Sequence, residues 1–242
     1  MIKKFLGYAI PSALAMFVSS LYTIIDGIFV GRGVGDNALA AVTIVMPITI
    51  MLFGIATMFA VGGGALVSKN FGAQKDEEGV NAFRQVFKFL LIISFVISLI
   101  LCIFSNTIVD ILGATELIKP LANTYLRYYA LFCIPNLIGI ALNSFIRNDN
   151  RPKLAMVSTI LGAVTNIILD YVFIFLFGMG IKGAAIATGL GQLVTVFIVI
   201  PHFIMKKGKL TFGNVTLDKK VIKEFANIGV PSFLAESAFS VI

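Results

Sequence analysis

Charged residues are scarce in this sequence of 242 residues, where Asp, Glu, Lys and Arg together make up only 13%. Soluble globular domains usually carry about 25% charged residues. Hydrophobic residues account for 58% of the chain, and a soluble fold of this length could not bury so much apolar surface. The shortage of charge therefore excludes an ordinary soluble domain and predicts that lipid surrounds the protein.

Residues that serve metal, redox and nucleophilic chemistry are also rare. The sequence has one histidine, His202, and two cysteines, Cys102 and Cys133, which both fall within apolar runs. We expect buried free thiols rather than a disulfide, and no Cys/His metal spacing occurs. No paired nucleophile and base is evident, and no Gly-Lys-Ser/Thr phosphate loop is present. The sequence therefore indicates neither an enzyme nor an ATP-driven pump, and it predicts no cofactor.

Apolar runs long enough to cross a bilayer are abundant. A transmembrane helix needs about 20 apolar residues. Six segments reach this length: Tyr8–Val30, Ala38–Val67, Phe87–Val109, Leu121–Phe145, Leu154–Phe177 and Gly183–Met205. Prolines 11, 47 and 135 fall within these segments, where we expect local bending rather than gating hinges. We predict an all-α, polytopic transmembrane helix bundle.

Basic residues are distributed unequally between the loops. If the N-terminus lies inside, 15 of the 19 Lys and Arg residues fall on the inner side. Only Arg32, Lys119 and Lys182 fall on the outer side, and Arg127 lies within the fourth span. The positive-inside rule then predicts a multi-pass protein of the plasma membrane with a cytoplasmic N-terminus. Topology explains the net charge of +7, so no nucleic acid partner is expected.

The start of the chain recurs near its end. At a fixed offset of 220 positions, seven residues are repeated: Ile2, Lys3, Phe5, Pro11, Ser12, Leu14 and Ala15. Six spans separate the copies, so both begin on the same side, as in a parallel repeat; the alternative is a chance likeness of two helix starts. We predict a six-helix lobe (1–205), a cytoplasmic linker (206–224) and the truncated start of a second lobe (225–242).

Three acidic residues, Asp26, Asp170 and Glu236, fall within apolar runs. A carboxylate at membrane depth is unfavourable by about 3 kcal/mol on insertion scales and is mostly kept where it faces a cavity, an ion or a proton path. For Asp26 the alternative is an acid near the interface that simply reaches water.

The calculated depth of residues in the membrane places two of these acids at the level of neutral oxygen ligands. Asp26 lies about 27 Å, and Asp170 about 24 Å, from the inner starts of their spans. Thr188 lies at a similar level, and Asn166 shares a helix face with Asp170. Carboxylate, amide and hydroxyl oxygens suit sodium or a proton, so the spacing predicts a cation or proton site.

Several stretches match a known family in order along the whole chain. They are Ile10–Ser12, Asp26–Gly31, Ala38–Val42, Gly62–Ala65, Phe71–Ala73, Asn148–Lys153, Asn166–Asp170 and Gly180–Thr188. The chain resembles the multidrug and toxic compound extrusion family of antiporters, whose members look like two six-helix lobes facing each other in a V. The resemblance implies a six-helix N-lobe of a twelve-helix transporter plus the start of helix seven. The family's second lobe is missing beyond Ile242, and truncation is a simpler account than pairing of half-length chains.

The resemblance also implies a function. It implies secondary active multidrug efflux, in which sodium or protons are exchanged for organic cations and other xenobiotics. It places the cation site on Asp26, Asn166, Asp170 and Thr188, with the backbone carbonyl of Ala184 as a further ligand and sodium as the metal candidate. The expected partners are the lipid bilayer, small organic cations and the missing second lobe.

Three other functions stay open at this point. A lipid-linked precursor flippase of related architecture should have basic residues in its central cavity. Arg127 alone gives only weak support for this function. A membrane enzyme would need a catalytic constellation that the sequence does not show. The third alternative is a structural fragment that is inactive without its other half.

Overall fold

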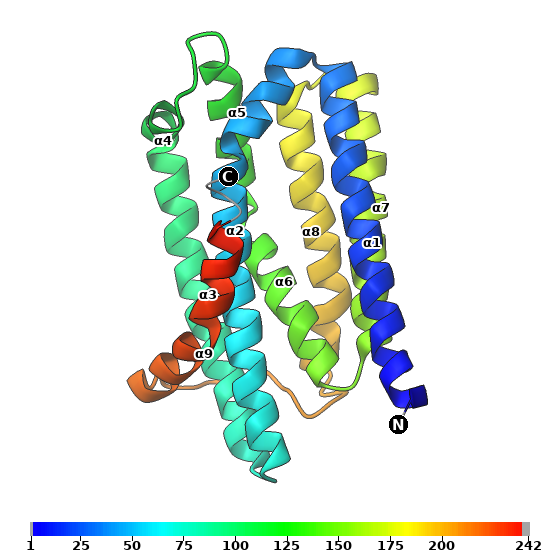
Figure 1. Ribbon diagram of the computed structural model, residues 1–242, viewed down its shortest axis with the longest axis vertical. Helices are drawn as coiled ribbons and strands as arrows, with labels where there is room; N and C mark the ends of the chain where they lie inside the picture. The colour runs from blue at the N-terminus through cyan, green and yellow to red at the C-terminus, as the bar shows by residue number, and fades with distance from the viewer. Residues whose placement is uncertain (1, 239–242) are drawn as a thin grey trace.

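The computed structural model describes residues 2–238, and this range is a bundle of helices without a strand. The elements are α1 (Ile2–Gly33), α2 (Asp36–Gly72), α3 (Asp76–Ile103), α4 (Ser105–Ile111), α5 (Lys119–Leu131), α6 (Cys133–Asn148), α7 (Pro152–Asp170), the π-helix η1 (Tyr171–Leu176), α8 (Ile181–Ile204) and α9 (Lys219–Ala238). The long helices stand side by side, with the chain reversals gathered at the two ends of the bundle (Figure 1). The predicted all-α bundle is confirmed.

The fourth predicted span, Leu121–Phe145, is not one helix. Its two parts, α5 and α6, meet at an angle of 54° and form a single span only as a bent pair. The break falls at Phe132, three residues before Pro135. Proline has no N–H to donate to the carbonyl four residues earlier, but it is tolerated in the first turn of a new helix. The chain therefore bends near Pro135, as expected, but through a break between two helices, whereas Pro11 and Pro47 lie inside continuous helices.

The third predicted span, Phe87–Val109, is displaced toward the N-terminus. Its helix α3 begins at Asp76 and ends at Ile103, and the short α4 follows after Phe104. The first turn of α3 contains three acidic residues, which favour a helix N-terminus because they interact with the helix dipole. The sequence-based boundary missed this polar extension because it followed hydropathy alone.

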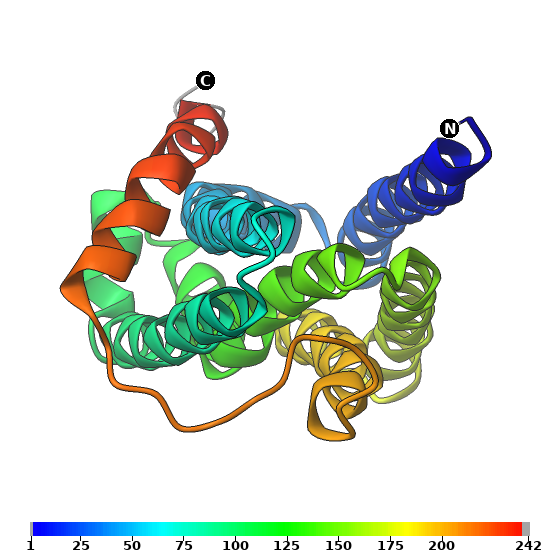
Figure 2. The same ribbon diagram turned by 90° about the horizontal axis from the view of Figure 1, so that it is seen from below.

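The linker between α8 and α9 packs against the N-terminal half of α3. Residues 206–218 contain no helix and run along one edge of the bundle when it is viewed from below (Figure 2). Arg84 Nε donates to the carbonyl oxygen of Thr211 at 2.9 Å, and Lys88 Nζ donates to that of Val215 at 2.8 Å. Two basic side chains of α3 thus hold the linker through its backbone.

The predicted boundary at residue 225 falls inside a helix, because α9 begins at Lys219. Helix α9 therefore includes the last part of the predicted linker. Residue 1 of the predicted first lobe and residues 239–242 of the predicted second lobe lie outside the described residues.

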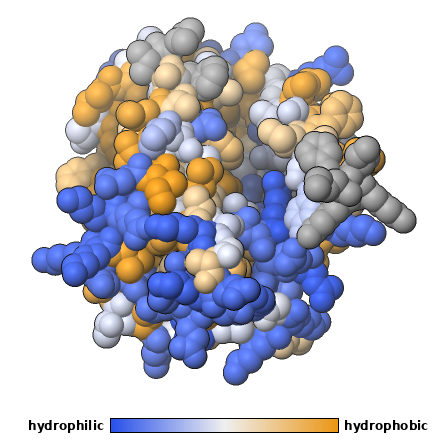
Figure 3. Space-filling model, turned by 60° about the horizontal axis from the view of Figure 1, so that its bottom comes forward, coloured by the Kyte–Doolittle hydropathy of each residue, from blue (hydrophilic) through white to orange (hydrophobic). Residues whose placement is uncertain are grey.

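The outer surface of the bundle suits lipid. Five helical segments are long and apolar enough to cross a membrane: Leu6–Gly33, Asp36–Gly72, Asp76–Ile103, Pro152–Leu176 and Ile181–Ile204. Large apolar side chains point outward, among them Phe17 and Phe197, which are 63% and 68% exposed. Figure 3 shows hydrophilic residues gathered toward the lower end, with hydrophobic residues predominating above them. This pattern is that of a multi-pass membrane protein.

Helix α9 packs along α2 through two glycines. A Cβ on Gly62 would collide with the carbonyl oxygen of Phe225, and a Cβ on Gly229 with that of Met58. The Phe225 ring is fully buried, and its centroid lies 5.2 Å from that of Phe59. Small residues allow transmembrane backbones to approach closely, so α9 belongs to the packed bundle.

The variant Gly62→Ala should force α2 and α9 apart. We expect the free energy of unfolding to fall by about 1–3 kcal/mol, as for other overpacked contacts, measured by thermal unfolding in detergent. Gly72→Ala is the matched control in the same helix, because a Cβ there has no atom within 4 Å; it should change stability by less than about 0.5 kcal/mol. Equal stabilities of the two variants would contradict the close α2–α9 packing.

Candidate functional site

Helices α7 and α8 approach each other closely at a pair of glycines. A Cβ on Gly162 would lie 2.8 Å from the carbonyl oxygen of Gly191, and a Cβ on Gly191 would lie 2.8 Å from that of Gly162. Thr195 Oγ1 reinforces the contact by donating to the carbonyl oxygen of Ser158 at 3.2 Å. Because the helices are antiparallel, the residues one turn further toward the α7–α8 reversal also face each other.

Asn166 and Thr188 are those next residues. Asn166 Nδ2 donates to Thr188 Oγ1 in a long hydrogen bond of 3.5 Å. Asn166 is 3% exposed, and its Oδ1 is buried without a hydrogen-bond donor. The amide therefore presents one unsatisfied acceptor oxygen between the two helices.

Asp26 of α1 and Asp170 of α7 bring their carboxyl groups together. The two carboxyl groups are close enough for their charges to interact, and the Asn166 side chain lies close to Asp170 as well. Asp170 is fully buried, and neither of its carboxyl oxygens has a hydrogen-bond donor; Asp26 Oδ1 is buried and lacks a donor as well. Ionised carboxylates are acceptors only, so two charged carboxylates that lie close together repel each other unless a cation or proton lies between them.

The site is thus rich in acceptors and poor in donors. Buried polar atoms in proteins usually have a hydrogen-bond partner, yet four oxygens of Asp26, Asn166 and Asp170 have none. Carboxylate and amide oxygens are ligands for hard cations, and a carboxyl pair can also share a proton. In the part of the chain that the structure describes, no three His, Cys, Asp or Glu residues form a metal-binding group. A cation would therefore depend on the two carboxylates and on neutral oxygens.

The structure brings together the side chains of the four residues predicted from depth. Ala184, the fifth predicted residue, lies one turn before Thr188 in α8 and is fully buried. Glu236, the third intramembrane acid, belongs to α9, where its Cβ lies close to Gly54 of α2. It is therefore placed on a different pair of helices. The roles of these residues in cation binding stay a prediction.

Two tyrosines near the carboxyl pair were missed by the sequence analysis. Tyr22 lies one turn before Asp26 on α1. Both Tyr22 and Tyr125 lie close enough to the two carboxyl groups for electrostatic interaction with them. Tyr125 of α5 stacks on Tyr129 with ring centroids 6.0 Å apart. The available signal was the four-residue spacing of Tyr22 from Asp26 and of Tyr125 from Tyr129, which places each pair on one helix face.

Comparison with known proteins identifies the family. A family model described as MatE matches residues 11–172, which is more than half of the chain. The chain belongs to the MatE family. The matched part of this MatE chain contains Asp26, Asn166 and Asp170, whereas Ala184 and Thr188 lie beyond it.

Curated relatives and solved structures extend the likeness over almost the whole MatE chain. The multidrug export protein MepA of Staphylococcus aureus (strain MSSA476) is 26% identical over 237 residues, which covers 96% of this chain and 52% of MepA. MepA of Staphylococcus saprophyticus is 26% identical over 236 residues with the same coverage. The chain therefore spans about half the length of the curated relatives it matches.

The solved structures show the same proportion. A crystal structure of MATE in the straight conformation superposes with a TM-score of 0.90 at 27% identity, covering 98% of this chain and 53% of that one. An outward-facing multidrug resistance MATE family transporter of the MOP superfamily gives a TM-score of 0.89 at 26% identity, covering 97% and 52%. The resemblance inferred from the sequence motifs is confirmed.

The carboxyl pair predicts that a cation stabilises this protein. At a cation concentration about 100 times its Kd, binding should add about 2.7 kcal/mol to the free energy of unfolding. In Asp170→Asn this gain should be lost, because one of the two carboxylate charges is removed. The measurement is the thermal unfolding midpoint in detergent, titrated with sodium at constant ionic strength and separately with acid.

Asp110→Asn is the control for loss of one carboxylate elsewhere. Asp110 pairs with Lys119 at 2.7 Å and is half exposed, so its variant should keep the wild-type response. A wild-type midpoint that responds to neither sodium nor acid would argue against a cation site.

Proposed function

We propose that this MatE chain is the cation-coupled lobe of a secondary active transporter that exports organic cations in exchange for sodium or protons. The observation that carries the proposal is the buried pair of Asp26 and Asp170, whose acceptor oxygens lack donors. Intramembrane carboxylates of this kind are retained mostly along ion or proton pathways. The relatives are named multidrug export proteins, which supports an exported drug as the exchange partner of the cation.

Helix α1 is the element that the cation would control. Only 11% of its apolar segment is buried, against 28% of the segment Pro152–Leu176 that contains α7, so α1 is the less enclosed helix. Asp26 lies on α1, whereas Asp170 lies on α7, the more enclosed of the two helices. A cation or proton between the carboxyl groups would remove their repulsion and hold α1 against α7, and its release would free α1 to move.

Coupling requires that cation and drug prefer different states of the lobe. We propose that the two states differ in the position of α1, with Pro11 as the point at which the helix changes direction. Cation entry from outside would then favour the state that releases the drug. The second lobe, which would complete the drug-binding cavity, is part of this proposal.

The proposed orientation places the N-terminus in the cytoplasm. In Figure 1 the N-terminus, the α2–α3 and α6–α7 turns and the linker lie at the lower end of the bundle. These are the segments to which the basic residues of the sequence were assigned, and positive charge favours the cytoplasmic side. We propose the plasma membrane as the location.

The flippase alternative has lost its support. Arg127, on which it rested, donates through Nε to Ser105 Oγ at 2.8 Å and so joins α5 to the start of α4. This contact gives Arg127 a structural role.

Ethidium efflux from cells that express the full-length protein tests the exchange mechanism. Wild-type efflux should be driven by an imposed sodium or pH gradient. Asp170→Asn should lower the gradient-driven rate by about tenfold, a factor typical of a lost coupling free energy, because one coupling charge is absent. The control Asp110→Asn should transport like the wild type. Wild-type efflux that ignores both gradients, with membrane expression confirmed, would exclude cation-coupled export of this substrate.

A further inference from the structure

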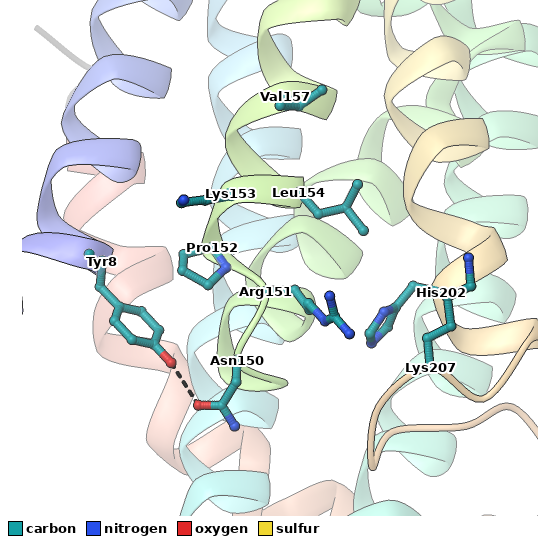
Figure 4. A pocket seen from close by; sticks show the side chains of 10 residues that line it. Tyr8, Asn150, Arg151, Pro152, Lys153, Leu154, Val157, His202 and Lys207 are labelled. Carbon is teal, nitrogen blue, oxygen red and sulfur yellow. Dashed lines mark hydrogen bonds between the residues drawn. The ribbon is translucent and has the colours of Figure 1, made fainter. Parts of the chain in front are cut away.

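A cavity of about 680 Å³ lies at the N-terminal end of the bundle, away from the carboxyl pair. It opens between the start of α1, the α6–α7 turn and the end of α8 (Figure 4). Its lining residues are Gly7, Tyr8, Asn150, Arg151, Pro152, Lys153, Leu154, Val157, His202 and Lys207. None of these residues is acidic, and three of them are permanently basic.

The basic residues of this cavity form no ion pair within the described part of the chain. Arg151, Lys153 and Lys207 are exposed, and none of them takes part in an ion pair with another described residue. In Figure 4, Arg151 lies next to His202, with Lys207 close by. The cavity therefore presents three positive charges that no direct ion pair neutralises.

The nearest acid is withdrawn from the cavity. Asp149 Oδ2 bonds to His202 Nε2 at 2.7 Å, and its side chain is only 3% exposed. The same carboxylate accepts the backbone N–H groups of Lys209 at 2.9 Å and Leu210 at 3.3 Å. Asp149 therefore forms the wall behind the cavity, and its single negative charge offsets only part of the three positive charges of Arg151, Lys153 and Lys207.

Part of the cavity wall is apolar. Leu154 and Val157 follow the basic rim along α7, and Val157 is 41% exposed. These residues continue into the apolar segment Pro152–Leu176, which is long enough to cross the membrane. The cavity thus joins a basic rim at the end of the bundle to an apolar surface at membrane depth, which is the order of headgroup and acyl chain in a lipid leaflet.

We propose that this cavity binds one anionic phospholipid from the leaflet that meets this end of the bundle. Arg151 and Lys207 would hold the phosphate, and an acyl chain would lie along Leu154 and Val157. Basic pockets between transmembrane helices on the cytoplasmic side are known to suit anionic headgroups. The lipid would also contact α1, because Tyr8 lines the cavity and its hydroxyl donates to Asn150 Oδ1 at 2.7 Å.

Native mass spectrometry of the full-length protein, released from nanodiscs of phosphatidylcholine and phosphatidylglycerol, tests this site without any transport assay. The wild type should retain one phosphatidylglycerol in preference to phosphatidylcholine. Each basic residue near a membrane surface strengthens binding by about fivefold, so the double variant Arg151→Gln/Lys207→Gln should lose about 25-fold in phosphatidylglycerol affinity. Excess inorganic phosphate should not displace the lipid, because it cannot use the apolar wall.

The matched control is Lys219→Gln/Lys220→Gln, which removes the same charge from two exposed lysines at the start of α9. It should retain phosphatidylglycerol like the wild type. Equal retention of the two lipids by the wild type, or equal loss in both double variants, would overturn the proposal. Displacement of the lipid by phosphate alone would overturn it too, because it would indicate a site for free phosphate.

Discussion

The contact between the backbones of α7 and α8 at Gly162 and Gly191 determines the arrangement of the candidate site. Inside a bilayer the hydrophobic effect does not draw helices together, so close packing of small residues must do so. This contact fixes Asn166 and Thr188 opposite each other and leaves Asp170 buried beside them. The third participating helix, α1, is less enclosed than α7, so the carboxyl pair joins a more enclosed helix to a less enclosed one.

The candidate site was predictable from the sequence because helix geometry in a membrane is nearly invariant. A rise of about 1.5 Å per residue and a fixed core thickness place Asp26, Asp170 and Thr188 at one level without any knowledge of tertiary contacts. The tyrosines Tyr125 and Tyr129 were not predictable in this way. Their orientation depends on how α5 is rotated about its axis, which the spacing of residues within one helix does not reveal.

The break between α5 and α6 at Phe132 depends on packing that the sequence does not reveal. Pro135 removes one backbone hydrogen bond, and such a loss is compatible with a mild bend or with a sharp break. Here the Phe132 side chain covers Gly189 of α8 so closely that a Cβ on Gly189 would collide with it. The packing of Phe132 against α8 thus influences whether the chain bends mildly or breaks. The residue pattern of a single helix does not reveal which surface of another helix it will meet. The polar linker shows the same limit, since its polarity indicates a loop but not the backbone contacts with Arg84 and Lys88.

The two ends of α1 connect the proposed lipid cavity with the proposed cation site. Tyr8 and Asp26 are 18 residues apart on one continuous helix, which corresponds to about 27 Å. If both ligands favour the position in which α1 lies against α7, each must raise the affinity for the other by the same factor, because linkage is reciprocal. A bend at Pro11, which lies between the two sites, would move one end of α1 without the other and so break this linkage. The state of the helix at Pro11 would then determine whether the membrane lipid can influence cation binding.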